Sequence, residues 1–294
     1  MSKIKGIYAA SMSIFNKNLS LNIDKTIKHA EKIIDQGCHG AAIFGSTGQA
    51  QLISVSEKIS LLNNLSNSKY KDKYLIGTGL NSLGETINLM KISSSLGFNN
   101  FLIMPPAYYK YGDFEVIEFY TKLIKAVPES KIILYNFEKL CGYKFSIDCV
   151  NKLAKQFPNQ IVGVKDSSYN LYEKLKLKNF SIFPGSELKL LKGLQLGCSG
   201  IITATCNVTA EISRKVYNDF FLGKEQLHNK KLCDVRNAFD KYNLISGLHS
   251  LCSQENEIYK NILPPLCLLN KTEENDLINT LKELNFKYKI PLVA

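Results

Sequence analysis

The chain has 294 residues, 45% of them hydrophobic and 21% charged, and it is long enough to bury a core without disulfide or metal staples. This composition excludes a disordered chain, a collagen-like repeat and a small disulfide-rich scaffold. No apolar run approaches the roughly 18 residues that a membrane-spanning helix needs, and segment 1–15 lacks the apolar core of a signal peptide. We therefore expect a soluble, cytoplasmic protein with no membrane partner.

The net charge is +11, yet Arg214 and Arg236 are the only arginines among 37 basic residues. The lysines are scattered over most of the predicted helices. Proteins that recognise nucleic acids favour arginine forks and a concentrated basic face. We therefore expect no nucleic-acid partner, and only a mild attraction for small anionic molecules.

The eight cysteines form no CxxC pair and no nearby Cys/His cluster, which argues against a zinc site or a thioredoxin-like site. Several of them lie in apolar patterns, where a free cysteine behaves as a small hydrophobic residue. We expect reduced cysteines in the core of a protein from a reducing compartment.

Short β-rich runs alternate with longer amphipathic stretches over most of the chain. Most of the runs are continuously apolar, which is typical of strands buried on both faces of a parallel sheet. The predicted strands are Ile4–Ala10, His39–Phe44, Tyr74–Leu80, Asn100–Met104, Lys131–Phe137, Ile161–Lys165, Phe180–Phe183 and Gly200–Thr205.

Helical spacing of apolar residues fills the intervals between these strands. The first predicted helix is Asn22–Gln36, which Gly37 terminates, and the second is Ser56–Ser66, with Ser56 as its N-cap and Glu57 in the first turn. Only the stretch Ser168–Lys176 has a weak helical pattern. The other predicted helices are Ser82–Leu96, Asp113–Ala126, Ser146–Phe157, Glu187–Leu196 and Ala210–Phe221.

Eight strand–helix units within residues 1–223 predict an α/β fold, a (β/α)8 TIM barrel. A doubly wound sheet is the alternative, but no GxGxxG motif follows the first strand. The alternation stops after Gly223, and the remainder has helical patterns broken at Pro264–Pro265. We therefore expect a catalytic barrel at 1–223 and a C-terminal helical extension at 224–294 packed on it.

The active site of such a barrel lies at the carboxyl ends of the strands, so polar residues at those ends are the candidates. The second strand ends in Gly45-Ser46-Thr47-Gly48, a tight turn whose amides and hydroxyls could hold a small carboxylate. An ordinary strand-to-helix turn is the alternative.

The fourth strand leads into Pro105-Pro106-Ala107-Tyr108-Tyr109, where two prolines stiffen a loop. Aromatic packing would also explain that loop.

Two further strand ends carry groups suited to covalent and proton-transfer chemistry. Tyr135 closes an apolar strand and could bury its ring while its hydroxyl acts as a proton relay; core packing is the alternative. Lys165 closes the sixth strand. Burial disfavours the charged form of a lysine, and the neutral amine is a nucleophile that can form a Schiff base with a ketone. The alternative is a lysine that extends its amine to solvent.

At these residues the sequence resembles the dihydrodipicolinate synthase/N-acetylneuraminate lyase family of pyruvate-dependent class I aldolases. The resemblance covers nearly the whole chain. It implies a TIM barrel, usually a homotetramer, that works without a metal or an organic cofactor. The matching motifs are GSTGQ at 45–49, PPAYY at 105–109, YN at 135–136, GVKDSS at 163–168, PGSE at 184–187 and GIITATCNV at 200–208.

The resemblance also implies roles for single residues. Lys165 falls on the Schiff-base lysine and Tyr135 on the tyrosine that moves protons. Ser46 and Thr47, after Gly45, fall on the pair that holds the pyruvate carboxylate.

Three more positions follow from the same resemblance. Tyr108 falls on the tyrosine that the synthases lend to a neighbouring subunit's site. Gly185 and Ile202 fall on positions that line the substrate pocket.

The sequence departs from both well-known branches of the family. Leu140 stands where the synthases carry an arginine for the carboxylate of their aldehyde substrate, and Gln49 replaces the usual glutamate. Leu140 and the Ser46 turn resemble the sialate lyases. The polyol-binding residues of those lyases, however, are replaced by Leu188 and Ala204.

These features predict a Schiff-base lyase that joins or cleaves pyruvate and an aldehyde, with a 2-oxo-3-deoxy acid as its substrate class. Three alternatives remain open. One is a dihydrodipicolinate synthase with a divergent semialdehyde site, and another is a dehydratase of 2-oxo-3-deoxy sugar acids. The third is a barrel that binds an oxo acid without catalysis.

Overall fold

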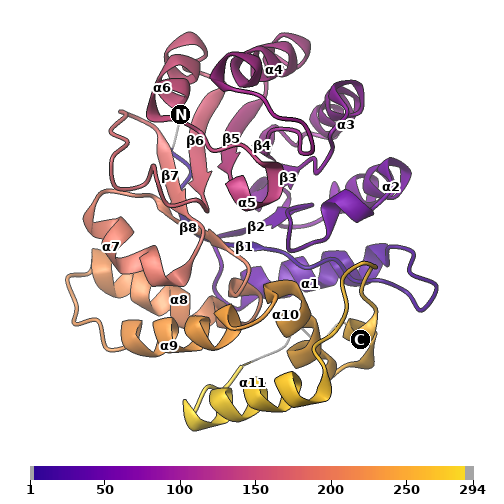
Figure 1. The fold of residues 1–294 in the computed structure, drawn as a ribbon, viewed down its shortest axis with the longest axis vertical. Helices are drawn as coiled ribbons and strands as arrows, with labels where there is room; N and C mark the ends of the chain where they lie inside the picture. The colour runs from indigo at the N-terminus through magenta and orange to yellow at the C-terminus, as the bar shows by residue number, and fades with distance from the viewer. Residues whose placement is uncertain (1–2, 289–294) are drawn as a thin grey trace.

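The computed structural model describes residues 3–288. Eight parallel strands form one sheet in the order β7-β6-β5-β4-β3-β2-β1-β8, and helices surround it (Figure 1). The Ser199 amide donates to the Ile182 carbonyl at 2.8 Å where β7 approaches β8, so the barrel is nearly closed. The strands are β1 (Gly6–Ala10), β2 (Gly40–Ile43), β3 (Tyr74–Gly77), β4 (Asn100–Ile103), β5 (Lys131–Asn136), β6 (Ile161–Asp166), β7 (Ser181–Pro184) and β8 (Gly200–Thr203).

This arrangement is a (β/α)8 TIM barrel, which confirms the predicted fold class. A doubly wound sheet is excluded because the strands are arranged in chain order from β1 to β7 and the last strand, β8, returns to pair with β1. The helices are α1 (Ile23–Asp35), α2 (Val55–Leu65), α3 (Leu83–Ser95), α4 (Asp113–Ala126), α5 (Glu138–Cys141), α6 (Ile147–Gln156), α7 (Leu190–Gln195), α8 (Cys206–Phe221), α9 (Asn229–Asp240), α10 (Leu244–Ser253) and α11 (Lys271–Glu283).

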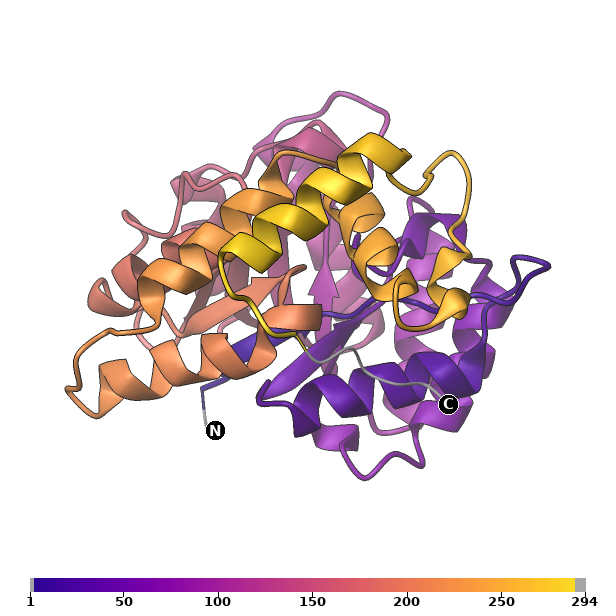
Figure 2. The same cartoon turned by 90° about the horizontal axis from the view of Figure 1, so that it is seen from below.

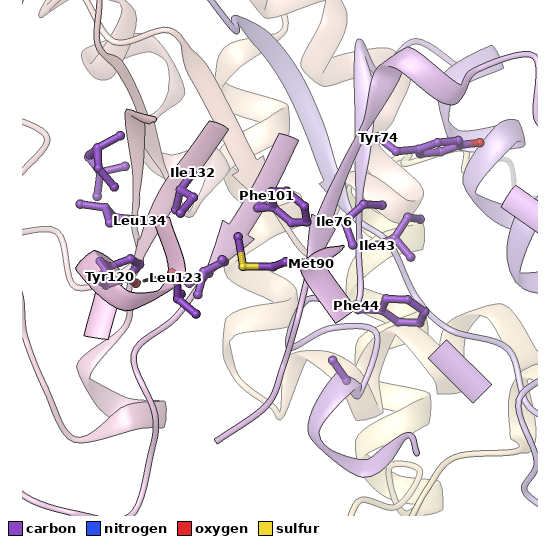
Figure 3. Packing of buried hydrophobic residues seen from close by; sticks show 14 of the residues in the cluster. Ile43, Phe44, Tyr74, Ile76, Met90, Phe101, Tyr120, Leu123, Ile132 and Leu134 are labelled. Atoms are coloured by element: carbon purple, nitrogen blue, oxygen red, sulfur yellow. Dashed lines mark hydrogen bonds between the residues drawn. The ribbon is translucent and has the colours of Figure 1, made fainter. Parts of the chain in front are cut away.

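The strands are apolar on both faces because each face packs against a different layer. In β4, Phe101 and Ile103 face the layer between the strands and the helices, whereas Leu102 points into the barrel. Figure 3 shows the outer layer, where Phe101 lies near Met90 of α3. The inner set, here called the interior layer, consists of Ala42, Leu75, Leu102, Ile133, Tyr135, Phe183 and Ile202.

Several predicted elements differ from the structure in their bounds, among them the starts of two helices. Helix α2 begins at Val55, and its N-cap is Ser54 rather than Ser56. The Ser54 hydroxyl accepts from the Glu57 amide while the Glu57 carboxylate accepts from the Ser54 amide, a reciprocal capping box. Helix α8 begins at Cys206, earlier than predicted, because β8 ends at Thr203.

The weak helical pattern at Ser168–Lys176 corresponds to no α-helix in this fully described segment. The chain instead wraps around the carboxylate of Asp166 at the end of β6. That carboxylate accepts from the amides of Tyr169, Leu171 and Tyr172, each at 2.9 Å. Backbone groups satisfied in this way need no helix.

A C-terminal helical part follows α8. Helix α11 lies beside α9 and α10 on the outside of the barrel (Figure 2). These helices share a buried cluster with the loop after β1: Met12 and Ile14 pack with Phe239, Leu248 and Leu277. Within residues 3–288 no helix is long and apolar enough to cross a membrane.

The described chain leaves all eight cysteines as free thiols. Six of them are buried, as the sequence predicts. Cys233 is only partly buried and Cys267 is exposed, so these two are not core residues.

Candidate active site

Lys165 and Tyr135 are direct neighbours at the carboxyl ends of β6 and β5, because the two residues pair in the sheet register. Lys165 is 3% exposed. Its Nζ lies 4.1 Å from the centroid of the Tyr135 ring. The ring face therefore holds the amine inside the barrel mouth.

The turn after β2 reaches the same place from across the barrel. Ser46 Oγ and Tyr135 Oη are 3.0 Å apart, and either hydroxyl can donate. Thr47 beside it is buried. The amides of Gly48 and Gln49 donate to carbonyls inside the turn, so an anion bound here would use the hydroxyls and the backbone amides of Ser46 and Thr47. The structure thus brings together four of the predicted site residues.

The side chain of Gln49 ties the turn to the C-terminal part of the chain. Its Oε1 accepts from the Leu263 amide at 2.8 Å, and its Nε2 lies 3.2 Å from Nε2 of His249. His249 Nδ1 lies 2.8 Å from the Tyr259 carbonyl, which only accepts, so Nδ1 carries the proton. Nε2 of the neutral ring then accepts from the Gln49 amide.

This geometry gives glutamine at position 49 a defined function. Burial lowers the pKa of His249 to about 4, so the ring is neutral at ordinary pH. A carboxylate at position 49 has no proton to donate to the ring's free nitrogen. The side-chain amide of Gln49 donates this hydrogen bond.

Asn136 and Asp166 are site-supporting residues that the sequence analysis missed. The Asn136 side-chain amide donates to Asp166 and to Asn170, both at 2.8 Å, and its oxygen accepts from the Phe145 amide at 3.1 Å. Asp166, although adjacent to Lys165 in sequence, makes no ion pair with it in the described structure. Both residues could have been found in the sequence, because Asn136 follows Tyr135 at the end of β5 and Asp166 follows Lys165 at the end of β6.

Gly185 and Ile202, which the sequence predicts to line the pocket, lie directly after β7 and within β8. A Cβ at Gly185 would lie 2.2 Å from Ser167 Oγ, so a larger residue here would force the Ser167 side chain to move. Ile202 is fully buried in the interior layer together with Tyr135 and Phe183. It forms part of the apolar floor beneath the lysine and the tyrosine.

Tyr108 and Leu140 lie at the exposed rim. Tyr108 is 89% exposed, has a φ of +88°, and contacts Tyr109 edge to face with ring centroids 5.1 Å apart. Within the described chain, no hydrogen bond joins Tyr108 to the group around Lys165. Leu140 lies on the short helix α5 and is 43% exposed.

A buried carboxylate lies behind the ends of β7 and β8, and the sequence analysis missed it. Glu187 is fully buried and accepts from Thr203 at 2.9 Å, Thr205 at 2.5 Å and Arg236 at 3.0 Å. These donors neutralise the charge and satisfy the oxygens. The oxygens of Glu187 are therefore occupied by partners within the protein. Its apolar neighbours Leu188 and Ala204 offer a substrate no hydrogen-bonding side chain.

Lys58 is a second buried lysine, on α2. Burial lowers its pKa to about 8, and its Nζ donates to the Thr78 carbonyl at 2.8 Å. Its amine is thus held by the backbone after β3. Lys58 is thus, besides Lys165, a second buried lysine whose amine has to be considered as a nucleophile.

A closed parallel barrel with a lysine, a tyrosine and a serine gathered at the carboxyl ends of its strands places the chain among the (β/α)8-barrel enzymes. The model of the dihydrodipicolinate synthetase family matches residues 3–284. The chain belongs to this family, and it is a carbon–carbon lyase of the pyruvate-dependent class I aldolase type.

Individual relatives support this assignment. An uncharacterized DapA-like lyase of Chloroflexus aurantiacus is 25% identical over 282 residues, which cover 93% of this chain and 94% of the relative. An N-acetylneuraminate lyase of Clostridium perfringens is 29% identical over 224 residues, covering 73% and 75%. The crystal structure of dihydrodipicolinate synthase from Agrobacterium tumefaciens has the same fold, with a TM-score of 0.87 at 22% identity over 96% of this chain and 99% of that one.

Proposed function

We propose that the enzyme joins or cleaves pyruvate and a neutral hydroxyaldehyde, so that its substrate is a 2-oxo-3-deoxy acid. The observation that carries this proposal is the grouping of three side chains: Lys165 Nζ lies 4.1 Å from the Tyr135 ring centroid, and Ser46 Oγ lies 3.0 Å from the Tyr135 hydroxyl. An amine, a proton-transfer group and a carboxylate-binding group are what imine chemistry on a 2-oxo acid requires.

In cleavage, the neutral amine of Lys165 attacks the C2 carbonyl carbon. Tyr135 donates the proton with which the former carbonyl oxygen leaves as water, so a protonated imine and a Tyr135 phenolate result. When the C3–C4 bond breaks, its electron pair moves toward the imine nitrogen and forms an enamine. The C4 hydroxyl gives its proton to the Tyr135 phenolate, and the aldehyde leaves. Protonation of the enamine and hydrolysis of the imine release pyruvate and restore the amine. Condensation is the reverse sequence.

Ser46 and Thr47 hold the carboxylate of the 2-oxo acid in this scheme. Both hydroxyls lie at the turn after β2, and a carboxylate there places the keto carbon toward Lys165. Fixed orientation of this kind is one of the larger contributions to enzymatic rate. Gly45 opens the turn, and Ile202 and Gly185 border the same pocket.

Tyr108 acts in a homotetramer in this proposal and completes the site of a neighbouring subunit. Its 89% exposure leaves the ring available to a second chain. Tyrosine is enriched among the residues that anchor protein–protein interfaces.

Leu140 determines the choice of aldehyde. A carboxylate-bearing aldehyde such as aspartate semialdehyde needs a charged donor at the rim, and leucine offers none. Lys144 nearby is engaged with Glu138 at 2.9 Å. A neutral aldehyde meets no such penalty, and the absence of side-chain donors at Leu188 and Ala204 argues against a long polyol such as a sialic acid.

The test is condensation of pyruvate with aspartate semialdehyde and with a set of neutral hydroxyaldehydes, for the wild type and Leu140→Arg. We expect wild-type kcat/KM to be roughly 10–150-fold lower for the semialdehyde, the effect of about 1.5–3 kcal/mol from one missing charged hydrogen bond. Leu140→Arg should shift the ratio toward the semialdehyde, whereas Leu140→Met should leave it unchanged.

Other outcomes assign the function differently. A wild-type kcat/KM of about 10⁴ M⁻¹s⁻¹ or more with the semialdehyde would establish a dihydrodipicolinate synthase. Loss of water from a sugar acid without release of pyruvate would establish a dehydratase. Binding of pyruvate with no turnover of any substrate would establish a non-catalytic barrel.

A further inference from the structure

A cavity lies at the opposite end of the barrel from the candidate active site. It has a volume of about 790 Å³ and is lined by residues at the amino-terminal ends of β1, β3, β4, β5, β6 and β7. In barrel enzymes this end usually serves stability, and catalytic residues lie at the other end. A hollow of this size here therefore calls for its own explanation.

The charges around this basal cavity are unbalanced. Four lysines line it, Lys3, Lys5, Lys73 and Lys131, against the single carboxylate of Asp72. In residues 3–288, none of the four lysines has a carboxylate oxygen within ion-pair distance. The ammonium of Lys73 lies 4.7 Å from the centroid of the Tyr70 ring. Like charges gathered without counter-charges repel one another and attract anions.

The positive charges of two of these lysines also act on a neighbouring histidine. His39 follows α1, and its Nδ1 accepts from the Ile7 amide at 3.0 Å. Its pKa is lowered to about 4, mainly by burial and further by the positive charges of Arg214, Lys73 and Lys5. Lys5, directly before β1, and Lys73, directly before β3, thus act on one common region.

The cavity also has an apolar floor and neutral donors. Ile4 and Val162 pack against the interior layer and line the hollow from within. A Cβ at Gly40 would lie 2.2 Å from the Lys73 carbonyl and 2.5 Å from the Tyr8 ring. Glycine at this position therefore allows both groups, which belong to residues that line the cavity, to pack against it. The side chains of Asn100 and other lining residues supply neutral hydrogen-bonding groups.

We propose that the basal cavity binds a small organic anion with two or more negative charges, either a di- or triphosphate or a polycarboxylate. The lysine ammonium groups contact the charged oxygens, and the carbon skeleton lies on the apolar floor. Lysine suits this task because it is a compact point charge on a flexible stem that can follow anions of different shape. Binding stabilises the folded protein because it removes the repulsion among the lysines.

The test is isothermal titration calorimetry with inorganic pyrophosphate and, separately, with citrate. Saturating pyruvate is present throughout to occupy the catalytic end. Salt is kept at about 50 mM, where exposed charges are weakly screened. The variant Lys5→Gln/Lys131→Gln removes two lining charges. The matched control Lys152→Gln/Lys282→Gln removes two charges from exposed positions on α6 and α11.

We expect one anion per chain with a dissociation constant of about 1 mM or tighter. The cavity variant should bind at least about tenfold more weakly, and the control should bind within about twofold of the wild type. Binding of pyrophosphate alone assigns phosphate compounds, and binding of citrate alone assigns polycarboxylates. Absence of saturable binding by both, or equal weakening in the two variants, would overturn the proposal.

Thermal unfolding separates ligand binding from a structural role. Without anion, the cavity variant should unfold at the same temperature as the wild type or higher, because repulsion is relieved. With anion, the wild type and the control should gain stability and the cavity variant should not. A cavity variant that is markedly less stable without anion would show that these lysines support the fold, and would contradict the proposal.

Discussion

The ring and the hydroxyl of Tyr135 serve different partners at the centre of the candidate site. The ring face contacts the Lys165 amine, whereas the hydroxyl lies 3.0 Å from Ser46. A substitution that removes only the hydroxyl therefore separates packing from proton transfer. Removal of the ring would disturb both.

Tyr135→Phe is expected to lower kcat by at least tenfold, because a lost proton relay typically reduces the rate by ~10²–10⁴-fold. Pyruvate should still be trapped on the protein, since the lysine and the ring remain. Steady-state kinetics and mass spectrometry measure the two effects. Tyr242→Phe, which removes a hydroxyl bonded to Asp276 on the surface, should leave kcat unchanged. Near wild-type turnover of Tyr135→Phe would show that Tyr135 only packs in the site and transfers no proton.

Residues at strand ends could be placed from the sequence because a parallel barrel brings every carboxyl end to one face. That rule is enough to bring Ser46, Tyr135 and Lys165 together. It gives no information on Gln49 and His249, which are 200 residues apart and meet only because α10 packs near the turn after β2. Their pairing depends on the tautomer of a buried ring, which no local pattern encodes.

At the scale of the element, two serines two residues apart compete as the start of α2. The S-x-x-E spacing that defines a capping box joins Ser54 to Glu57 and leaves out Ser56. The Glu57 carboxylate also accepts from the Leu21 amide at 2.8 Å, so the cap links α2 to the segment before α1. Ser56, in contrast, lies within the first turn of the helix.

Ser54→Ala is expected to lower the free energy of unfolding by about 1 kcal/mol, the usual effect of a lost N-cap. Ser56→Ala should change it by less than about 0.5 kcal/mol, as surface substitutions generally do. Urea denaturation of the two variants side by side gives the comparison. Equal destabilisation by the two substitutions would contradict the assigned cap.

The strands were predictable because each is apolar on both faces over its length, as in β5, where Ile132 and Leu134 face outward and Ile133 faces inward. The connection between β6 and β7 was not. There the carboxylate of Asp166 replaces a helix as the acceptor for backbone amides. A single aspartate with that function has the same local sequence signal as any loop aspartate.

At the scale of the whole molecule, buried histidines join parts of the chain that are distant in sequence. His29 on α1 donates from Nε2 to Oδ1 of Asn207 on α8 at 2.8 Å, and its Nδ1 accepts from the Tyr259 hydroxyl at 2.8 Å. His249 contacts the Tyr259 carbonyl. The barrel and the C-terminal helices are thus linked through neutral imidazole rings.

Stability should therefore depend on pH. Burial lowers the pKa of both His29 and His249 to about 4, whereas an unfolded histidine titrates near 6.5. Between these values the unfolded chain binds protons that the folded chain does not, so stability is fully present above about pH 6.5 and is lost as pH falls toward 4. From pH 7.5 to 5.5 we expect a loss of roughly 1 kcal/mol per histidine.

Urea denaturation at a series of pH values measures this dependence, and His29→Gln should make it shallower by removing one titrating group. A free energy of unfolding that stays constant between pH 7.5 and 5.5 would show that the two rings are not held neutral by burial.

The central claim is that Lys165 forms an imine with a 2-oxo acid, and borohydride reduction in the presence of pyruvate tests it most directly. Reduction makes the link permanent, so intact-protein and peptide mass spectrometry can count and locate it. We predict one reduced pyruvate per chain on the peptide that contains Lys165, and none in a folded Lys165→Ala variant, which should also lack turnover. Labelling that persists in Lys165→Ala, or that falls on the other buried amine, Lys58, would contradict the account.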